Sequence, residues 1–125
     1  SPRSCYNLTT IKGVTMTFEE YQKQALSTVL STGDEFKDLL HFVLGLSGET
    51  GEVAEKFKKI IRDKNGIISE EDKLELTKEL GDVLWYIAVF SDALGVSLDT
   101  VVNQNVEKLN SRQLRGSLDG SGDNR

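Results

Sequence analysis

Two pairs of acidic residues attract attention because each interrupts an apolar helical pattern with the same spacing. Glu49 and Glu52 form the first pair, and Glu79 and Asp82 form the second, with 26 residues between the pairs. A three-residue step along an α-helix leaves two side chains about 60° apart on one face, one turn along. Each pair could therefore converge on one ion.

The surrounding residues place these carboxylates beside a packing face. Glu49 stands where the apolar seam of Leu46 and Val53 would require an apolar side chain. Carboxylates in such places are costly unless they are paired or bind a metal, and four together would repel strongly. An oxygen-binding divalent cation, most often Mg²⁺, would relieve that repulsion.

Glycines flank both pairs at positions 45, 48, 51 and 81. A glycine in a helix interior costs roughly 1 kcal/mol relative to alanine. Their use here suggests that another helix or a ligand approaches closely.

Hydrophobic periodicity predicts four helices and no strands, which defines an all-α, four-helix bundle-like fold. The helices are expected over about residues 17–33, 34–63, 69–95 and from 97 onward. A capping box is predicted at Thr17 with Glu20, and Ser69 with Asp72 is expected to open the third helix. In the second helix an apolar residue recurs every seven positions, at Leu39, Leu46, Val53 and Ile60.

Length and composition indicate one globular domain. The chain has 125 residues, of which 38% are hydrophobic and 28% charged, and a net charge of −5. The negative charge argues against a general nucleic-acid binder, and no apolar run reaches the roughly 18–20 residues of a membrane span. We expect an N-terminal extension over 1–15 (upstream sequence or a cloning addition), a domain over 16–115 and a flexible C-terminal tail over 116–125. The first 15 residues lack the apolar core of a signal peptide, so we expect a cytoplasmic protein.

Other catalytic and metal-binding patterns are absent from the sequence. There is no GxxxxGK[ST] phosphate-binding loop and no Cys/His set that could hold zinc. No ExxH motif accompanies the acidic pairs, which disfavours a di-iron bundle.

The stretches GLSGETGEVAEKFKK (45–59) and ELGDVLWYIA (79–88) strongly resemble the MazG-like all-α nucleoside triphosphate pyrophosphohydrolase superfamily. Its hallmark is ExxE, a spacer and ExxD. TFEEYQKQA (17–25) and NVEKLNSR (105–112) extend the resemblance over most of the chain. The resemblance implies Mg²⁺-dependent cleavage of a nucleoside triphosphate between its α and β phosphates, giving a monophosphate and pyrophosphate.

Site roles follow from the same resemblance. The metal ligands and catalytic groups would be Glu49, Glu52, Glu79 and Asp82. One of them, or a hydroxide on the metal, would be the base, and the sequence does not say which. Family members also assemble as homo-oligomers, and the wide apolar faces of the second and third helices agree with a homodimer or homotetramer.

Basic and aromatic residues supply candidates for substrate binding. Lys56 and Lys59 follow Glu52 by one and two turns and could contact phosphates, although they could equally lie on a solvated face. Asn105, Lys108 and Arg112 share one helical face and match the family's NxxK and following Arg, which reach phosphate or sugar. Trp85 could hold the base, but a Trp in such an apolar run is more often part of the core.

Three functions stay open on the sequence. The first is a pyrophosphohydrolase that removes non-canonical or surplus nucleotides. The second keeps the fold but acts on phosphoribosyl-ATP, dUTP or dCTP. The third is a non-enzymatic helical interaction module whose acidic pairs only solvate a face.

Overall fold

Four helices make up the protein in a computed structural model that describes residues 15–116. They are α1 (Phe18–Leu26), α2 (Glu35–Lys64), α3 (Glu70–Ala93) and α4 (Leu98–Arg115). The all-α expectation is confirmed, with no strand in the described range. Most of the expected N-terminal extension and C-terminal tail, residues 1–14 and 117–125, lies outside the described residues.

Side-chain caps start the helices where the sequence predicts them. Thr17 accepts a hydrogen bond from the backbone of Glu20 and completes a capping box, and Ser69 does the same with Asp72. Lys64, at the end of α2, lies 2.7 Å from an Asp72 carboxylate oxygen across the α2–α3 turn. The hydrogen bond from Lys64, with those from Ser69, lowers the pKa of Asp72 to about 2. These bonds fix the turn between the two long helices.

The expected end of the first helix near Gly33 is wrong, because α1 stops at Leu26. The hydroxyls of Ser27 and Thr28 donate to the carbonyls of Gln24 and Ala25, at 2.6 and 2.8 Å. Such local bonds offer the backbone groups an alternative to another helical turn. The following segment is tied instead to α2, where Asp38 accepts bonds from Ser31 and Thr32.

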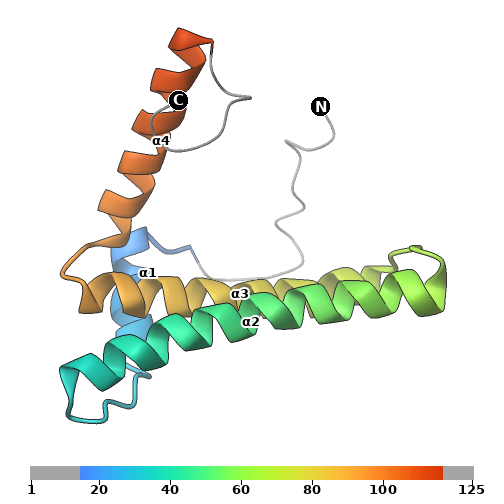
Figure 1. The fold of residues 1–125 in the computed structure, drawn as a ribbon, viewed down its shortest axis with the longest axis horizontal. Coiled ribbons are helices and arrows are strands. Elements are labelled where there is room, and N and C mark those ends of the chain that lie inside the picture. The colour runs from blue at the N-terminus through green and yellow to red at the C-terminus, as the bar shows by residue number, and fades with distance from the viewer. Residues whose placement is uncertain (1–14, 117–125) are drawn as a thin grey trace.

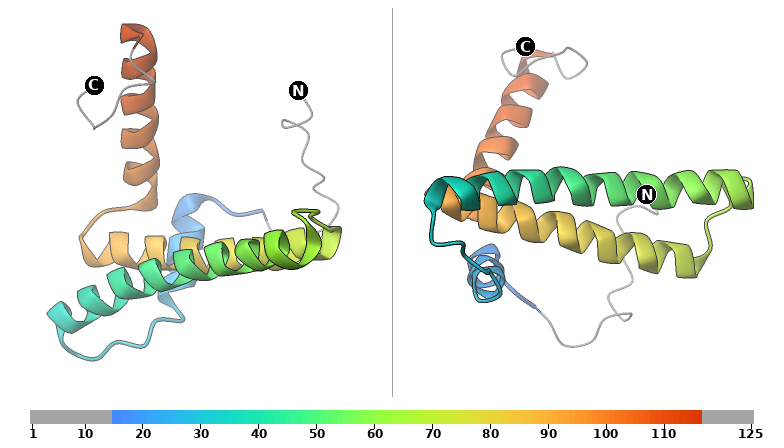
Figure 2. Two further views of the ribbon diagram at one scale, coloured as in Figure 1. Left: turned by 45° about the vertical axis from the view of Figure 1, so that its right-hand side comes forward. Right: turned by 60° about the horizontal axis from the view of Figure 1, so that its bottom comes forward.

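α3 is the common neighbour of the other helices. It packs along α2 as a long antiparallel pair, α1 crosses it, and α4 contacts α3 and α1 but not α2 (Figure 1). The chain bends by 102° between α3 and α4, so α4 projects from the pair in every view (Figure 2). A single chain therefore forms an open arrangement rather than a closed bundle.

The core gathers where α1 crosses α3, at Ala25, Phe42, Ala88, Val89 and Leu98. The buried Gln22 holds this junction together through its amide group. Its nitrogen donates to the carbonyls of Ala88 and Val96, at 3.0 and 3.3 Å, and its oxygen accepts from the backbone of Leu98. One side chain thus links α1 to α3 and to the start of α4.

Much apolar surface of the long helices stays exposed in the single chain. Leu44 on α2 is 67% exposed, and Leu80 and Leu84 on α3 are 55% and 41% exposed. Apolar patches of this kind mark interaction surfaces when they are contiguous. Within residues 15–116 no helix alone has the length and composition to cross a membrane, and α3 with α4 meets that criterion only as a bent pair.

The close approach suggested by the glycines occurs at one of them. A Cβ at Gly45 would overlap the ring of Tyr86, so α2 and α3 come together there only because position 45 has no side chain. At Gly48, Gly51 and Gly81 a Cβ would meet nothing within 4 Å. Those three positions are open, whereas Gly45 is required by packing.

We predict opposite effects for two alanine substitutions on α2. Gly45→Ala should lower the free energy of unfolding by about 1–3 kcal/mol, since the methyl group must displace Tyr86. Gly48→Ala should raise it by about 0.5–1 kcal/mol through better helix propensity. Urea denaturation followed by circular dichroism measures both, and equal effects would contradict the packing described here.

Candidate metal centre

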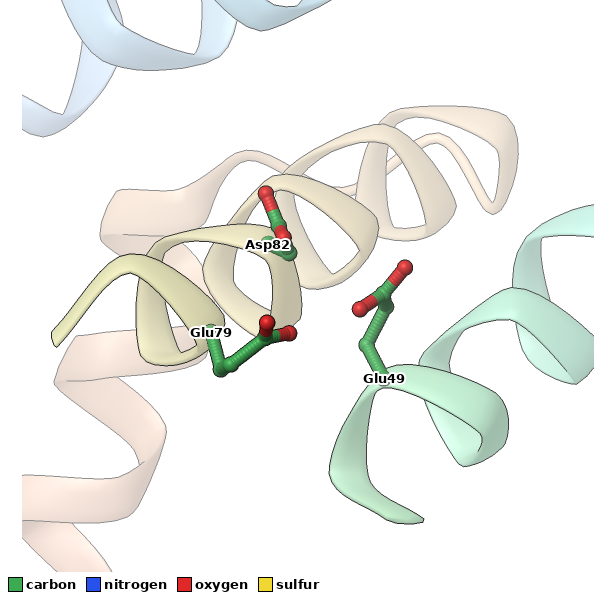
Figure 3. A group of neighbouring side chains, drawn as sticks. All are labelled: Glu49, Glu79 and Asp82. Carbon is green, nitrogen blue, oxygen red and sulfur yellow. The ribbon is translucent and has the colours of Figure 1, made fainter. Parts of the chain in front are cut away.

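Three carboxylates from the two long helices face one another. Glu49 extends from α2, and Glu79 and Asp82 extend from α3, toward a common point (Figure 3). One oxygen from each can be chosen so that all three lie within 4.8 Å of one another. This carboxylate cluster (Glu49, Glu79 and Asp82) arises because α2 and α3 pack side by side at these positions.

The carboxylate cluster carries unfavourable negative charge. The pKa of Glu49 lies above its ordinary value of 4.5, first because partial burial disfavours its ionised form. The charges of Asp82, Glu79 and Glu52 raise it further, and a hydrogen bond with Glu79 adds to the effect. A cation at this point would offset the negative charges that contribute to the shift.

Glu52 lies beside the cluster rather than in it. It is an exposed residue on α2, and its charge acts on Glu49, but its oxygens are not among those that converge. The structure therefore brings together three of the four acidic residues predicted to share a site. Glu52 lies one turn along α2 from Glu49, and its side chain is exposed to solvent.

Lys56 contacts the cluster directly. Its ammonium lies 2.8 Å from a carboxylate oxygen of Glu79 and 3.5 Å from one of Glu75. The hydrogen bond with Glu79 is the main reason that the pKa of Lys56 is raised. Lys56 and Lys59 also line an open groove between α2 and α3, together with Ile60 and Leu76. Lys56 thus lies next to the carboxylate cluster, whereas Lys59 is placed only in the groove, which Asp63, Asp72 and Glu75 also line.

The α4 candidates lie elsewhere in the single chain. Asn105 and Lys108 line a shallow hollow on α4 with Val101 and Gln104, and Arg112 is buried. Because α4 makes no contact with α2 and projects from the helix pair (Figure 1), these residues are not brought to the cluster within one chain.

Trp85 serves the core in this structure. Its indole N–H donates to the hydroxyl of Thr28 at 2.8 Å, and its ring meets Tyr86 edge to face, with centroids 4.9 Å apart. It packs against the buried cluster formed around Ala88 and Val89. This arrangement favours the core interpretation of Trp85 over base binding.

Tyr21 is a neighbour of the site that the sequence does not reveal. Its pKa is raised, mainly by partial burial and also by the charge of Asp82. In the sequence, Tyr21 is one of several residues at helical spacing on the apolar face of the first predicted helix. Only the crossing of α1 over α3 places it within electrostatic reach of Asp82.

Comparison with known proteins defines the class. Residues 37–115 match the MazG nucleotide pyrophosphohydrolase domain, and the chain belongs to that family. The match contains all three residues of the carboxylate cluster, Glu52 and the basic candidates on α2 and α4.

Individual relatives were found in a phage and in a bacterium. The "Gene 37 protein" of Mycobacterium phage L5 is 47% identical over 109 residues, which is 84% of this chain and 96% of the phage protein. The "Uncharacterized protein YvdC" of Bacillus subtilis (strain 168) is 48% identical over 42 residues, 34% of this chain and 40% of that protein. No solved structure matches the chain significantly.

We predict that Glu49→Gln stabilises the metal-free protein at pH 7. The pKa of Glu49 is raised in the folded protein, so the folded state favours the protonated carboxyl. The stabilisation from this protonated group is present below about pH 4.5 and is lost as the pH rises through the folded-state pKa. Removing the charge should therefore raise Tm in EDTA at pH 7 and change it little near pH 4. Thermal denaturation followed by circular dichroism measures this.

Glu55→Gln on the same helix is the control. The pKa of Glu55 is lowered, chiefly by a hydrogen bond from Lys58, so this substitution should give no stabilisation at pH 7. A Glu49→Gln protein that is less stable than the unsubstituted protein at pH 7 would contradict the repulsion described here.

Proposed function

We propose that the protein is a Mg²⁺-dependent nucleoside triphosphate pyrophosphohydrolase. It would cleave a ribo- or deoxynucleoside triphosphate between the α and β phosphates, releasing a monophosphate and pyrophosphate. The observation that carries the proposal is the convergence of Glu49, Glu79 and Asp82 from two helices in a chain of the MazG family.

The chemistry of the carboxylate cluster suits Mg²⁺. This ion prefers oxygen ligands, keeps several waters and is usually held by few carboxylates together with substrate phosphates. When bound, it would offset the charge of the triphosphate and lower the pKa of a coordinated water. The Glu49, Glu79 and Asp82 side chains would hold the ion and so fix where the phosphate chain lies.

The remaining residues have distinct roles in this proposal. Glu52 is exposed beside the cluster and would accept the proton of the attacking water. Lys56 and Lys59, in the adjoining groove, would contact the phosphates beyond the scissile bond. Phosphoryl transfer depends mainly on positioning and electrostatic stabilisation, so no nucleophilic side chain is needed.

Two substitutions test these roles. Asp82→Asn should weaken Mg²⁺ binding and reduce turnover together, because a ligand is lost. Glu52→Gln should reduce turnover by at least about a hundredfold while Mg²⁺ affinity changes little. Pyrophosphate release measures turnover, and isothermal titration calorimetry measures Mg²⁺ binding.

A substrate panel makes that experiment decisive. It should contain the common ribo- and deoxynucleoside triphosphates, dUTP, oxidised nucleotides and phosphoribosyl-ATP. Turnover of none of them, or full activity in both variants, would overturn the proposal and favour an interaction module.

A homodimer or homotetramer is part of the proposal. Assembly would cover the exposed leucines of α2 and α3, at positions 44, 80 and 84. Assembly would also place α4 of a second copy near the carboxylate cluster of the first. In that way Asn105, Lys108 and Arg112 of one copy would reach the carboxylates of the other copy, although they do not reach those of their own chain.

The mass in solution tests this assembly. Light scattering after gel filtration should give two or four times the 13.9 kDa of one chain. A Leu44→Glu, Leu84→Glu double variant should run as a monomer, because charges would be buried in the interface. Leu30→Glu, exposed in the α1–α2 connection, is the control and should leave the mass unchanged. A monomeric unsubstituted protein would contradict the assembly.

The cellular role follows from the reaction. We propose that the protein clears non-canonical or surplus nucleotides from the cytoplasmic pool.

A further inference from the structure

We propose that Lys56 is an internal cation that pairs with Glu79 of the carboxylate cluster until a metal ion displaces it. The proposal rests on the metal site inferred above. It assigns to one lysine a role in metal loading, which is separate from any contact with phosphate.

The geometry shows Lys56 in contact with a residue of the cluster. Its ammonium is 2.8 Å from Glu79, whose side chain is only 15% exposed. Of the ion pairs formed within residues 15–116, this is the one that reaches Glu49, Glu79 or Asp82. Ion pairs that are partly shielded from water are stronger than those on an open surface. Lys56 therefore supplies a positive charge to the Glu79 member of the carboxylate cluster.

A metal ion and Lys56 would compete for Glu79. An ammonium and a metal ion bound to the same carboxylate repel each other, so a metal ion held by Glu79 would weaken or displace the 2.8 Å contact with Lys56. Loading the metal then includes the cost of displacing the lysine. The lysine thus lowers the affinity of the cluster for a divalent ion.

Glu75 is the alternative ion-pair partner for Lys56 once a metal ion has displaced it from Glu79. It lies one helical turn before Glu79 on α3, and its carboxylate is already 3.5 Å from the Lys56 ammonium. Lys78 binds the other oxygen of Glu75 at 2.9 Å, so Glu75 is held in place. A small movement toward Glu75 would keep Lys56 at the groove and turn it from the carboxylates toward a bound polyphosphate. Metal entry would in this way release the lysine for the substrate.

Calorimetric titration of Mg²⁺ into protein stripped with EDTA, without nucleotide, tests the displacement. Lys56→Gln should bind Mg²⁺ at least about fivefold more tightly than the unsubstituted protein, since a contacting charge is worth that much even in a watery environment. Lys56→Arg keeps a cation and should bind Mg²⁺ like the unsubstituted protein. The KM of Lys56→Gln for the nucleotide should rise, so the two affinities move in opposite directions.

Lys78→Gln is the matched control. It removes the same charge from α3, next to Glu75, but Lys78 makes no ion pair with the cluster. Its Mg²⁺ affinity should change by less than twofold. An equal gain in Lys78→Gln would show a general effect of net charge and would overturn the displacement.

The outcomes separate this inference from the proposed function. If the unsubstituted protein binds Mg²⁺ and Lys56→Gln binds no more tightly, the displacement is wrong and the metal site stands. If only Lys56→Gln binds, the displacement is supported. If no variant binds Mg²⁺, the metal site fails, and the inference fails with it.

Discussion

The close packing of like charges between two helices is the constraint on which the candidate site depends. Three acidic side chains meet between α2 and α3, where burial and neighbouring charge together hold the pKa of Glu49 above its ordinary value. The fold tolerates this because one lysine lies against Glu79 and because the site opens to solvent on the Glu52 side. A cation bound at this point would reduce the repulsion between these side chains.

The helix pair keeps that arrangement in place. α2 and α3 are held at one end by the bonds of Asp72 to Lys64 and Ser69, and farther along by the contact of Gly45 with Tyr86. The carboxylates lie between these two points. Their spacing is therefore set by backbone packing rather than by the flexible ends of their own side chains.

Helix caps and helix faces could be predicted from the sequence, whereas contacts between side chains of different helices could not. The predicted capping box at Thr17 and the predicted start of α3 at Ser69 are both confirmed, and the ExxE and ExxD pairs lie on facing helices. Caps and helical phase depend on neighbouring residues, so the sequence can indicate them. The early end of α1 depends on Thr28, whose hydroxyl also accepts a bond from Trp85 57 positions away. The pairing of Lys56 with Glu79 rather than with the nearby Glu52, and the place of Tyr21 near Asp82, likewise require the packing of separate helices.

The open glycines next to the acidic residues allow the surroundings of the carboxylate cluster to change while the carboxylates stay in place. Gly48, Gly51 and Gly81 adjoin Glu49, Glu52 and Asp82 in the chain, yet a Cβ added at any of them would meet nothing within 4 Å. A methyl group at these positions would therefore add bulk beside the acidic residues without a clash between α2 and α3. Related chains can thus differ at these three positions while Glu49, Glu79 and Asp82 keep theirs.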